Sequence, residues 1–554
     1  MIANASSSSV ASPPERLDLG ALSLLPPLPE AFLAGRDLDL LAPLRFVRPG
    51  APPPLPPLPT PDRGVLAAAL GVANRAYGHP DAEALARKLA DPRARVVATG
   101  QQPGLFGGPL YALSKMVAAS RWAADLEAQG EPAVAVFWVA TEDHDWAEVA
   151  QATFLAPSGL RRFDLGEDPS PLAPLGTRTF GPEMARIHAE LAEAFPGETY
   201  APWRDALARW YRPEARFGEA FCRLAAHLLG PRCPLLLDAM LPELKQAEQP
   251  FLRRLVEERA ALEADYAATD AEIERRSFRL QVTPQRGVSP LFLYTRGERR
   301  RIEWREGDRF VLRGSRDEER PVAELLAAIE ENPGVVSPGV LARPAIQDSV
   351  LGTSVLLLGP GEISYIPQVA PAYRALGAAP AVALRPQVLV LEAATRGKLA
   401  AQALTASDLL GDPDLLERRL AARSGGDFVD PVRERIAAEL EGLKPRAAAI
   451  DPNLEKPLEK TLEQTLRALD LFAEKVRAAA MRRNEVEARR LAQLGDLLRP
   501  FGKPQERTLS AAQFAARLGP AFGEALWGLL DLDPTALQVI ELPPPPPAGT
   551  GGAA

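Results

Sequence analysis

Two short segments of this chain concentrate side chains that can do chemistry. The first is Thr99-Gly100-Gln101-Gln102-Pro103-Gly104, which continues through Gly107 and Gly108 to Pro109. The second is Glu142-Asp143-His144-Asp145. Glycines beside glutamine amides suit the binding of an anion, whereas carboxylates beside a histidine suit proton transfer, a cation or an amine. We therefore place the candidate site around these two segments.

The glycine segment follows a predicted strand and leads into a predicted helix. In open α/β sheets, ligands bind outside the carboxyl ends of the strands, where backbone N–H groups and the next helix N-terminus favour negative charge. The segment matches neither the GxGxxG nor the GxxxxGK[ST] pattern, so neither the NAD fingerprint nor the Walker P-loop applies. Gln101 and Gln102 supply amides, and Lys115 lies where it could reach an anion. The alternative is a tight turn without a ligand.

The acidic segment directly follows a predicted buried strand that contains Phe137 and Trp138. Four ionisable residues at such a place are costly unless water, a cation or a substrate compensates them. Asp143 and His144 could bind a divalent cation, hold a substrate amine, or form an acid/base couple in which the carboxylate fixes the imidazole tautomer. An exposed acidic turn is the alternative.

Polar residues also flank two later strands of the predicted sheet. They could face the same crevice, although arginines and carboxylates at strand ends are individually common. The last of them is an arginine, whose guanidinium suits a carboxylate or phosphate. These residues are Arg343, Gln347 and Asp348 before the first of the two strands, Gly359, Glu362 and Tyr365 after it, and Arg385 after the second.

Five short apolar runs predict the sheet that positions these residues. Each run is apolar on both alternating faces, which is typical of strands buried in a parallel sheet. An amphipathic stretch at 110–129 has the length of a crossover helix, so the first two runs predict a βαβ unit. The expected fold is α/β, with a Rossmann-like core over 61–390 and insertions at about 157–213 and 257–332. The runs lie at 95–99, 133–140, 235–238, 355–359 and 381–384.

The two ends of the chain differ from this core. Proline clusters predict an extended arm over 1–60, and the Pro/Gly/Ala composition of 543–554 predicts a disordered tail. The region 391–542 is predicted to be helical. Within it, apolar residues at alternating steps of four and three predict a coiled coil over about 456–494. This long helix would dimerise or lie over the active-site face, or else pack on its own domain.

Composition excludes several classes of protein. The 554 residues carry a net charge of −8, which offers no electrostatic reason to expect nucleic acid or an anionic membrane as partner. The two cysteines, Cys222 and Cys233, are too few for a disulfide framework. The sequence shows neither a signal peptide nor a membrane span, so we expect a cytoplasmic protein.

Together the candidate segments resemble the cysteine ligase family of bacillithiol biosynthesis, BshC. The resemblance spans the whole chain and rests on the order and spacing of several motifs. This sequence departs from the family pattern in small ways, at Gly339, Gly352 and Gly361. The motifs are 99–109 with Tyr111 and Lys115, Phe137-Trp138 with Glu142-Asp143-His144-Asp145, Arg343-Pro344 with Gln347-Asp348, Gly359-Pro360 with Glu362 and Tyr365, and Gln505-Glu506-Arg507.

The resemblance implies a Rossmann-like core with two connecting insertions, a C-terminal coiled coil and a homodimer. It also implies an enzyme that joins cysteine to glucosaminyl-malate. An amide forms from a carboxylate and an amine only after the acyl group is activated, so we expect a nucleotide, ATP or ADP. Asp145 or Glu142 could hold an accompanying Mg²⁺. The HIGH and KMSKS signatures of the related synthetase architecture are absent.

We assign expected roles under this hypothesis. Backbone N–H groups of the two glycine turns would position the nucleotide or activated cysteine, while Lys115 and Arg385 neutralise charge. His144 with Asp143 would accept a proton from the sugar amine or orient it. The catalytic set is Gln101, Gln102, Asp143, His144 and Asp145. The binding set is Thr99, Gly100, Gly104, Gly107, Gly108, Lys115, Glu142, Arg343, Gln347, Asp348, Gly359, Glu362, Tyr365 and Arg385.

Two other functions remain open at this point. In one, the chain is a metal-dependent hydrolase in which Asp143, His144 and Asp145 ligate zinc, although adjacent residues of one turn seldom converge on one ion. In the other, it is a non-catalytic coiled-coil scaffold without a small-molecule site.

Overall fold

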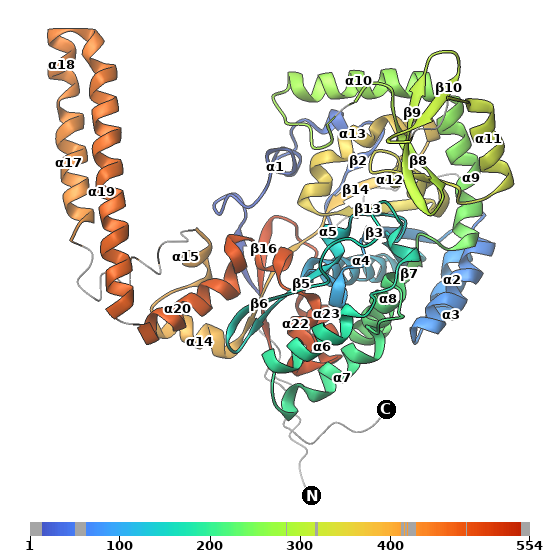
Figure 1. Ribbon diagram of the computed structural model, residues 1–554, viewed down its shortest axis with the longest axis horizontal. Helices are drawn as coiled ribbons and strands as arrows, with labels where there is room; N and C mark the ends of the chain where they lie inside the picture. Colours follow the sequence, from blue (N-terminus) through green and yellow to red (C-terminus); the bar gives the residue numbers. More distant parts are fainter. Residues whose placement is uncertain are drawn as a thin grey trace, which may run out of the picture. The chain divides into compact units, whose positions relative to one another are not determined.

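The fold is described from a computed structural model (Figure 1). It divides into two compact units, one made of 1–393 with 506–554 and the other of 394–505. Within the described part of the chain, no helix is both long enough and apolar enough to cross a membrane. The structure describes residues 14–49, 62–283, 285–315, 319–411, 415, 418, 428–483 and 485–543.

A six-stranded parallel sheet forms the centre of the first unit. The chain runs outward from β3 through β4 to β7, and then returns to β13 on the other side of β3. Ligands of such sheets bind at the carboxyl ends of the strands where this direction reverses. The five predicted strands and the Rossmann-like fold are confirmed. In spatial order the strands are β2 (Arg45–Phe46), β14 (Ala381–Leu384), β13 (Thr353–Leu358), β3 (Arg95–Gln101), β4 (Ala133–Val139) and β7 (Leu235–Asp238).

Successive residues of the central strands face two different helical layers. Val96 and Val136 belong to a large apolar core that also contains residues of α9 (Pro242–Glu257), α12 (Arg343–Leu351) and α13 (Pro360–Leu376). On the other face, α4 (Leu110–Ala128) packs against β3 and β4. Phe137 of β4 stacks there on Phe221 of α8 (Phe217–Leu229), with ring centroids 6.0 Å apart. Burial on both faces explains why these strands are continuous apolar runs.

The predicted extended arm over 1–60 is wrong for the part that the structure describes. This part contains β1 (Glu15–Asp18), α1 (Pro27–Leu33) and β2, and β2 pairs in parallel with β14 at the sheet edge. Proline sets φ near the value of the first helical turn, so Pro27 begins α1 instead of preventing it. The second proline cluster, at 51–57, lies outside the described residues, as does the tail beyond Pro543.

Both insertions carry secondary structure of their own, although the first begins at 146, before the predicted 157, and the second ends at 338, beyond the predicted 332. The first contains the hairpin β5–β6 and several helices, and the second contains α10 and an antiparallel five-stranded sheet in the order β11-β10-β9-β8-β12. The elements of the first are α5 (Trp146–Val149), β5 (Gln151–Ala156), β6 (Gly159–Asp164), α6 (Glu183–Ala194) and α7 (Ala201–Trp210). Those of the second are α10 (Arg259–Arg275), β8 (Val288–Thr295), β9 (Glu298–Arg305), β10 (Arg309–Leu312), β11 (Arg320–Pro321), α11 (Val322–Glu331) and β12 (Val336–Pro338).

The prediction that 391–542 is helical throughout is wrong at its C-terminal end. β16 (Ala536–Leu542) pairs in parallel with β15 (Gln387–Glu392) and antiparallel with β1. Both β15 and β16 are short apolar runs, whose periodicity alone does not distinguish a buried strand from a buried helix. Two helices before β16, α22 (Ala511–Leu518) and α23 (Ala521–Leu529), pack against α4 of the central layer.

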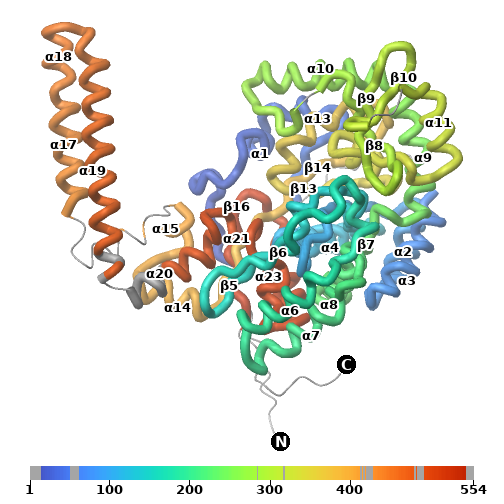
Figure 2. The backbone as a smooth tube through the Cα atoms, in the orientation of Figure 1, coloured from blue at the N-terminus to red at the C-terminus, as the bar shows by residue number. Residues whose placement is uncertain are grey.

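The second unit is helical. Two of its helices, α17 (Asp430–Gly442) and α19 (Glu455–Arg483), lie side by side as a hairpin that turns through α18 (Lys444–Ile450) (Figure 2). Arg433 Nε and Asp470 Oδ1 join them at 2.6 Å. The predicted coiled coil is therefore present. It covers α19 and α20 (Glu485–Leu498), and its nearest partner is a helix of the same chain. The unit also contains α14 (Ala393–Ala401) and α15 (Ala406–Gly411).

Candidate functional site

A cavity of about 440 Å³ opens at the carboxyl ends of β3, β4 and β13 in the first unit. It lies where the order in which the chain adds strands to the sheet reverses, as expected for a ligand site of this fold. Most of the predicted site residues meet there, although they come from four separate parts of the chain. The predicted residues that line it are Gly100, Gln101, Gln102, Lys115, Glu142, Asp143, His144, Arg343, Gly359, Glu362, Tyr365 and Arg385.

The other predicted residues do not line this cavity. Thr99 is fully buried in β3, and Asp145 begins α5 by accepting a hydrogen bond from the N–H of Glu148. Asp348 lies behind the site, where its carboxylate accepts a hydrogen bond from Tyr373 at 2.5 Å and another from Gln347. Burial raises the pKa of Asp348 to about 6. These residues support the site from behind instead of facing a ligand.

The glycine turn packs closely against the protein, and several of its N–H groups already have hydrogen-bond partners. A side chain at Gly100 would meet the carbonyl oxygen of Trp138 at 2.7 Å, so this glycine permits close approach of β3 and β4. The N–H groups of Gly104, Gly107 and Gly108 donate to Gln102 O, Tyr211 Oη and Leu105 O respectively. The expected cradle of N–H groups for an anion is therefore not available at these three glycines. The two glutamine side chains remain at the cavity wall.

Lys115 is buried at the base of the cavity and is already paired. Its Nζ lies 2.5 Å from Glu362 Oε2 and donates to Gly100 O at 2.9 Å. Glu362 also accepts a hydrogen bond from the Gly359 N–H, which caps α13. Burial, together with the nearby Arg385 and Arg343, lowers the pKa of Lys115, although Glu362 opposes this. This ion pair orients the end of β13 against β3.

Arg385, like Lys115, forms an ion pair with a glutamate of the protein. Its guanidinium donates to both carboxylate oxygens of Glu506, at 2.9 and 2.7 Å, in a fully buried bidentate pair. The terminal nitrogens of Arg385 are therefore committed to the protein, and only its Nε has no hydrogen-bond partner among the described residues, which narrows its expected role as the ligand of a substrate carboxylate. Tyr111 carries three cations around its ring, Lys115, Arg385 and Arg507, at 5.6, 5.5 and 5.7 Å from its centroid. We call this side of the cavity, with Arg343, the cationic wall.

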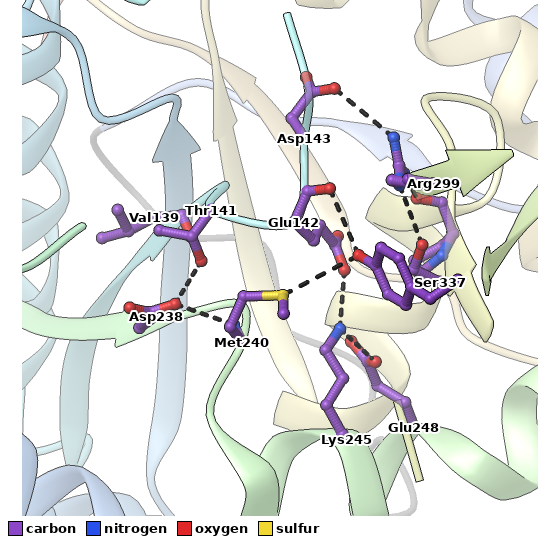
Figure 3. A network of polar contacts seen from close by, with 12 residues as sticks. Val139, Thr141, Glu142, Asp143, Asp238, Met240, Lys245, Glu248, Arg299 and Ser337 are labelled. Carbon is purple, nitrogen blue, oxygen red and sulfur yellow. Dashed lines mark hydrogen bonds and ion pairs between the residues drawn. The ribbon is translucent and has the colours of Figure 1, made fainter. Parts of the chain in front are cut away.

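Negatively charged side chains lie near the end of β4. Glu142 Oε2 accepts a hydrogen bond from Lys245 at 2.7 Å, and Lys245 also binds Glu248 at 2.9 Å (Figure 3). All three side chains are buried, and the other oxygen of Glu142 has no hydrogen-bond partner among the described residues. Two carboxylates share one ammonium, so this cluster carries a negative charge in excess whenever Glu248 is ionised. Burial raises the pKa of Glu248 to about 7.

The geometry around His144 decides its tautomer. Arg299 of β9 approaches His144 Nδ1 at 3.2 Å and Asp143 Oδ1 at 3.6 Å (Figure 3 shows the Asp143 contact). A guanidinium only donates, so Nδ1 accepts and the neutral ring carries its proton on Nε2. Burial and Arg299 both lower the pKa of His144, which keeps the ring neutral. His144 thus presents a donor to the cavity, contrary to its expected role as a base.

A carboxylate that the sequence did not single out lies beside this turn. Glu148 of α5 lines the cavity, and partial burial with the neighbouring Asp145 and Asp143 raises its pKa. Asp143 accepts hydrogen bonds from Gln102 Nε2 at 3.2 Å and from the His144 N–H at 2.8 Å. We call Glu142, Asp143 and Glu148 the acidic wall. The raised pKa makes the Glu148 carboxylate a candidate proton acceptor.

A third side of the cavity comes from the second insertion. Phe292 of β8 and Arg299 and Arg301 of β9 reach the site across β12 and the turn that follows it. Their positions in strands of a charged insertion gave no signal of function, because only tertiary packing brings the insertion to the sheet edge. Arg507 of the cationic wall belongs to a motif that the resemblance had marked.

The carboxylates do not form a metal centre. In the described part of the chain, no three His, Cys, Asp or Glu side chains are grouped to hold an ion. Glu142 is engaged by Lys245, and Asp145 caps α5, so each of the two alternative Mg²⁺ ligands already has a partner within the protein. The same observation argues against a zinc hydrolase built on Asp143, His144 and Asp145.

Comparison with known proteins decides the family. Residues 58–386 match the model of the N-terminal Rossmann-like domain of bacillithiol biosynthesis BshC, and 388–542 match its C-terminal coiled-coil domain. The chain belongs to the BshC family. A relative from Solibacter usitatus, named "Putative cysteine ligase BshC", is 31% identical over 489 residues, covering 87% of this chain and 90% of the relative. One of the same name from Salinibacter ruber is 29% identical over 494 residues, or 86% and 89%.

The predicted family membership is thus confirmed, and with it an enzyme of the cysteine ligase family. The two family models meet at 386–388, close to the start of the second unit at 394, although the second model extends beyond that unit to 542. A solved chain from Campylobacter jejuni, described as a putative arginyl-tRNA synthetase, covers 83% of this chain and 98% of its own length at 12% identity. Its TM-score of 0.26 is too low to carry an argument.

Proposed function

We propose that this chain joins the carboxyl group of cysteine to the amine of glucosaminyl-malate in the cavity at the ends of β3, β4 and β13. The observation that carries the proposal is the separation of charge in that cavity within a BshC chain. A cationic wall and an acidic wall face one space, which suits an acyl donor with a negative group and an acceptor with an ammonium group. Such opposed walls orient two reactants for attack.

The cationic wall holds the acyl donor. Arg507 lies over Tyr111 with an exposed guanidinium, and Arg343 lines the cavity beside it. Lys115 and Arg385 add positive potential from behind, although their hydrogen bonds go to Glu362 and Glu506. These arginines fit a carboxylate or a phosphate. If ATP binds here, Arg507 and Arg343 hold its phosphates, and the nucleotide supplies the activation of the cysteine carboxylate.

The acidic wall holds the amine of the acceptor. The ammonium group binds near Asp143 and loses a proton to Glu148, whose pKa is raised above the ordinary value of a glutamate. The amine nitrogen then attacks the activated carbonyl carbon, the new C–N bond forms, and the bond to the leaving group breaks. His144 Nε2–H donates to the oxygen on which negative charge develops.

The hairpin of α17 and α19 supports a homodimer, which we propose as the working assembly in the cytoplasm, where ATP is available. On α19, Leu471 is 54% and Phe472 49% exposed, although both are large apolar residues. A second copy of the same face would cover them. Sedimentation of the double variant Leu471→Ser, Phe472→Ser is expected to give a monomer where the original chain gives a dimer, and an unchanged mass contradicts this proposal.

Product formation tests the ligase function. The purified chain is incubated with cysteine, glucosaminyl-malate and ATP, and bacillithiol is measured by mass spectrometry. Glu148→Gln should lower kcat about 100-fold, the usual contribution of a positioned base. Glu167→Gln, an exposed carboxylate outside the cavity, is the matched control and should be unaffected.

The variants His144→Ala and Gln102→Ala complete the experiment. Each should lose at least about 10-fold in kcat, because each removes a hydrogen-bonding group from the cavity wall. Full activity in both variants would reject the site. The absence of bacillithiol with the original chain would reject the function itself.

A further inference from the structure

A second cavity, of about 600 Å³, lies beside the first in the same unit. It is bounded by α10 on one side and by β8, β9 and the segment after β12 on the other. Tyr266 and Trp304 give it aromatic walls. The two cavities share a wall that consists of Phe292, Arg301, Gly339 and Val340. A ligand longer than cysteine could therefore contact this wall from the candidate site.

Arg301 is the cation of this shared wall. It lies directly opposite Phe292 in the pairing of β9 with β8, and Arg299 precedes it by two residues on the same face of β9. Both guanidinium groups lie over the Phe292 ring, Arg299 at 3.9 Å and Arg301 at 4.8 Å from the centroid. A ring face stabilises a cation only modestly. It does not replace an anionic partner.

Arg299 and Arg301 differ in their hydrogen-bond and ion-pair partners. Arg299 donates to Ser337 Oγ at 3.0 Å and to Pro338 O at 2.6 Å, and it contacts His144. Arg301 has no hydrogen bond or ion pair from its guanidinium to any residue that the structure describes. The nearest carboxylate of β9, that of Glu303, forms ion pairs with Arg313 at 2.6 Å and with Arg305 at 2.9 Å. Arg301 is therefore a half-buried charge with five unused donors.

The charged groups around Arg301 also leave its positive charge uncompensated. Burial, Arg313 and Arg299 all lower its pKa, and Glu303 opposes them only in part. A guanidinium remains protonated even so. A half-buried cation among other cations is unfavourable unless an anion joins it. We therefore expect a negatively charged ligand to bind at the wall between the cavities.

We propose that Arg301 binds the carboxylate end of the acceptor substrate, and that the second cavity accommodates this end. The inference rests on the proposed function, because it uses the acceptor of that reaction. Glucosaminyl-malate carries an amine on its sugar and two carboxylates on its aglycone. The acidic wall attracts only the amine, and the cationic wall at Tyr111 is occupied by the acyl donor. The remaining cation, Arg301, therefore selects a dicarboxylate aglycone over a neutral one.

Two measurements test this assignment, one of binding and one of turnover. L-Malate alone serves as the binding probe in calorimetry, with the full chain and with Arg301→Gln and Arg301→Lys. Arg309→Gln is the matched control, because Arg309 lies on the same insertion sheet, is exposed and lines neither cavity. Loss of a charge-assisted hydrogen bond should weaken malate binding about 10- to 100-fold in Arg301→Gln. Arg301→Lys should lose less, since the charge remains.

The turnover measurement compares glucosaminyl-malate with methyl glucosaminide, which has a neutral aglycone. Arg301→Gln should raise KM for glucosaminyl-malate about 10- to 100-fold, while KM for the neutral glycoside and for cysteine stays unchanged. A KM that rises equally for both acceptors would indicate a structural role and overturn the proposal. Unaltered malate binding in Arg301→Gln, or no malate binding by the original chain, would also overturn it.

The outcomes separate this inference from the proposed function. If the original chain forms no bacillithiol but binds malate through Arg301, the subsite stands and the ligase function fails. If the chain forms bacillithiol and Arg301→Gln keeps its KM for glucosaminyl-malate, only the subsite fails. Thermal unfolding of Arg301→Gln beside Arg309→Gln confirms that both variants fold before either result is interpreted.

Discussion

Two buried lysines, Lys115 and Lys245, lie beneath opposite walls of the same cavity. Each is less than 5% exposed and each donates to a glutamate. Lys115 has one carboxylate, Glu362, and two arginines nearby, and its pKa is lowered by burial and by Arg385 and Arg343. Burial also opposes the charge of Lys245, but the carboxylates of Glu142 and Glu248 outweigh it and raise the pKa.

The difference shows how one fold produces two walls of opposite sign. A buried lysine does not by itself make a site basic or acidic. The balance depends on how many carboxylates share its ammonium group, one at Lys115 and two at Lys245. In a region of low dielectric such an imbalance acts over several ångströms. The comparison can be tested by changing each member of the two clusters.

The largest effect is expected from Lys245→Met. It leaves Glu142 and Glu248 buried without their cation, and breaking a buried pair in this way costs about 3–5 kcal/mol of unfolding free energy. Denaturant unfolding measures the loss. Lys88→Met, which removes an exposed ion pair with Glu127, is the control and should cost less than about 1 kcal/mol. Equal losses in the two variants would contradict the comparison.

Glu248→Gln should change how stability depends on pH. The pKa of Glu248 is raised to about 7 in the folded chain, so the folded state binds this proton more tightly than the unfolded state does. The stability linked to it is present below about pH 4.5 and is lost as the pH rises towards 7. The loss approaches about 3 kcal/mol for a shift of this size.

The difference between the unfolding free energies of the original chain and Glu248→Gln, measured from pH 4.5 to 8, reports this group alone. The original chain should lose stability relative to the variant as the pH rises. A difference that stays constant with pH would show that Glu248 is ionised throughout, and that the acidic wall carries more charge than we infer.

The smallest effect in this series is expected from Lys115→Met. Glu362 loses its ammonium partner but keeps the Gly359 N–H, so the chain should still fold. The cationic wall loses positive potential, and kcat/KM for cysteine should fall about 100-fold, or about 2.7 kcal/mol. KM for glucosaminyl-malate should change little. A loss confined to that acceptor would reverse our assignment of the two walls.

Local pattern was sufficient for the framework of the site. The five apolar runs of the central sheet, the crossover helix and the two segments at the ends of β3 and β4 all occur where the sequence placed them. The reason is that strands buried on both faces need continuous apolar residues, and parallel strands bring their carboxyl ends to one edge. The family motifs then marked Arg507, far from the rest in the chain.

The roles of individual side chains were less predictable. Arg385 looked available for a ligand, but Glu506 from the C-terminal part of the chain accepts hydrogen bonds from both of its terminal nitrogens. His144 looked like a base, but Arg299 from the second insertion fixes it as a donor. In each case the deciding partner is more than a hundred residues away, and no local spacing indicates such a contact.

The sequence by itself determined the fold class, the family and the edge of the sheet at which chemistry can occur, because these depend on periodicity and on short motifs. Only the tertiary structure decided which charges are neutralised and which remain. Burial makes an unpaired charge costly, so the partners of Lys115, Lys245 and Arg299 set the sign of each wall. Most of those partners come from distant parts of the chain that meet only when the chain is folded.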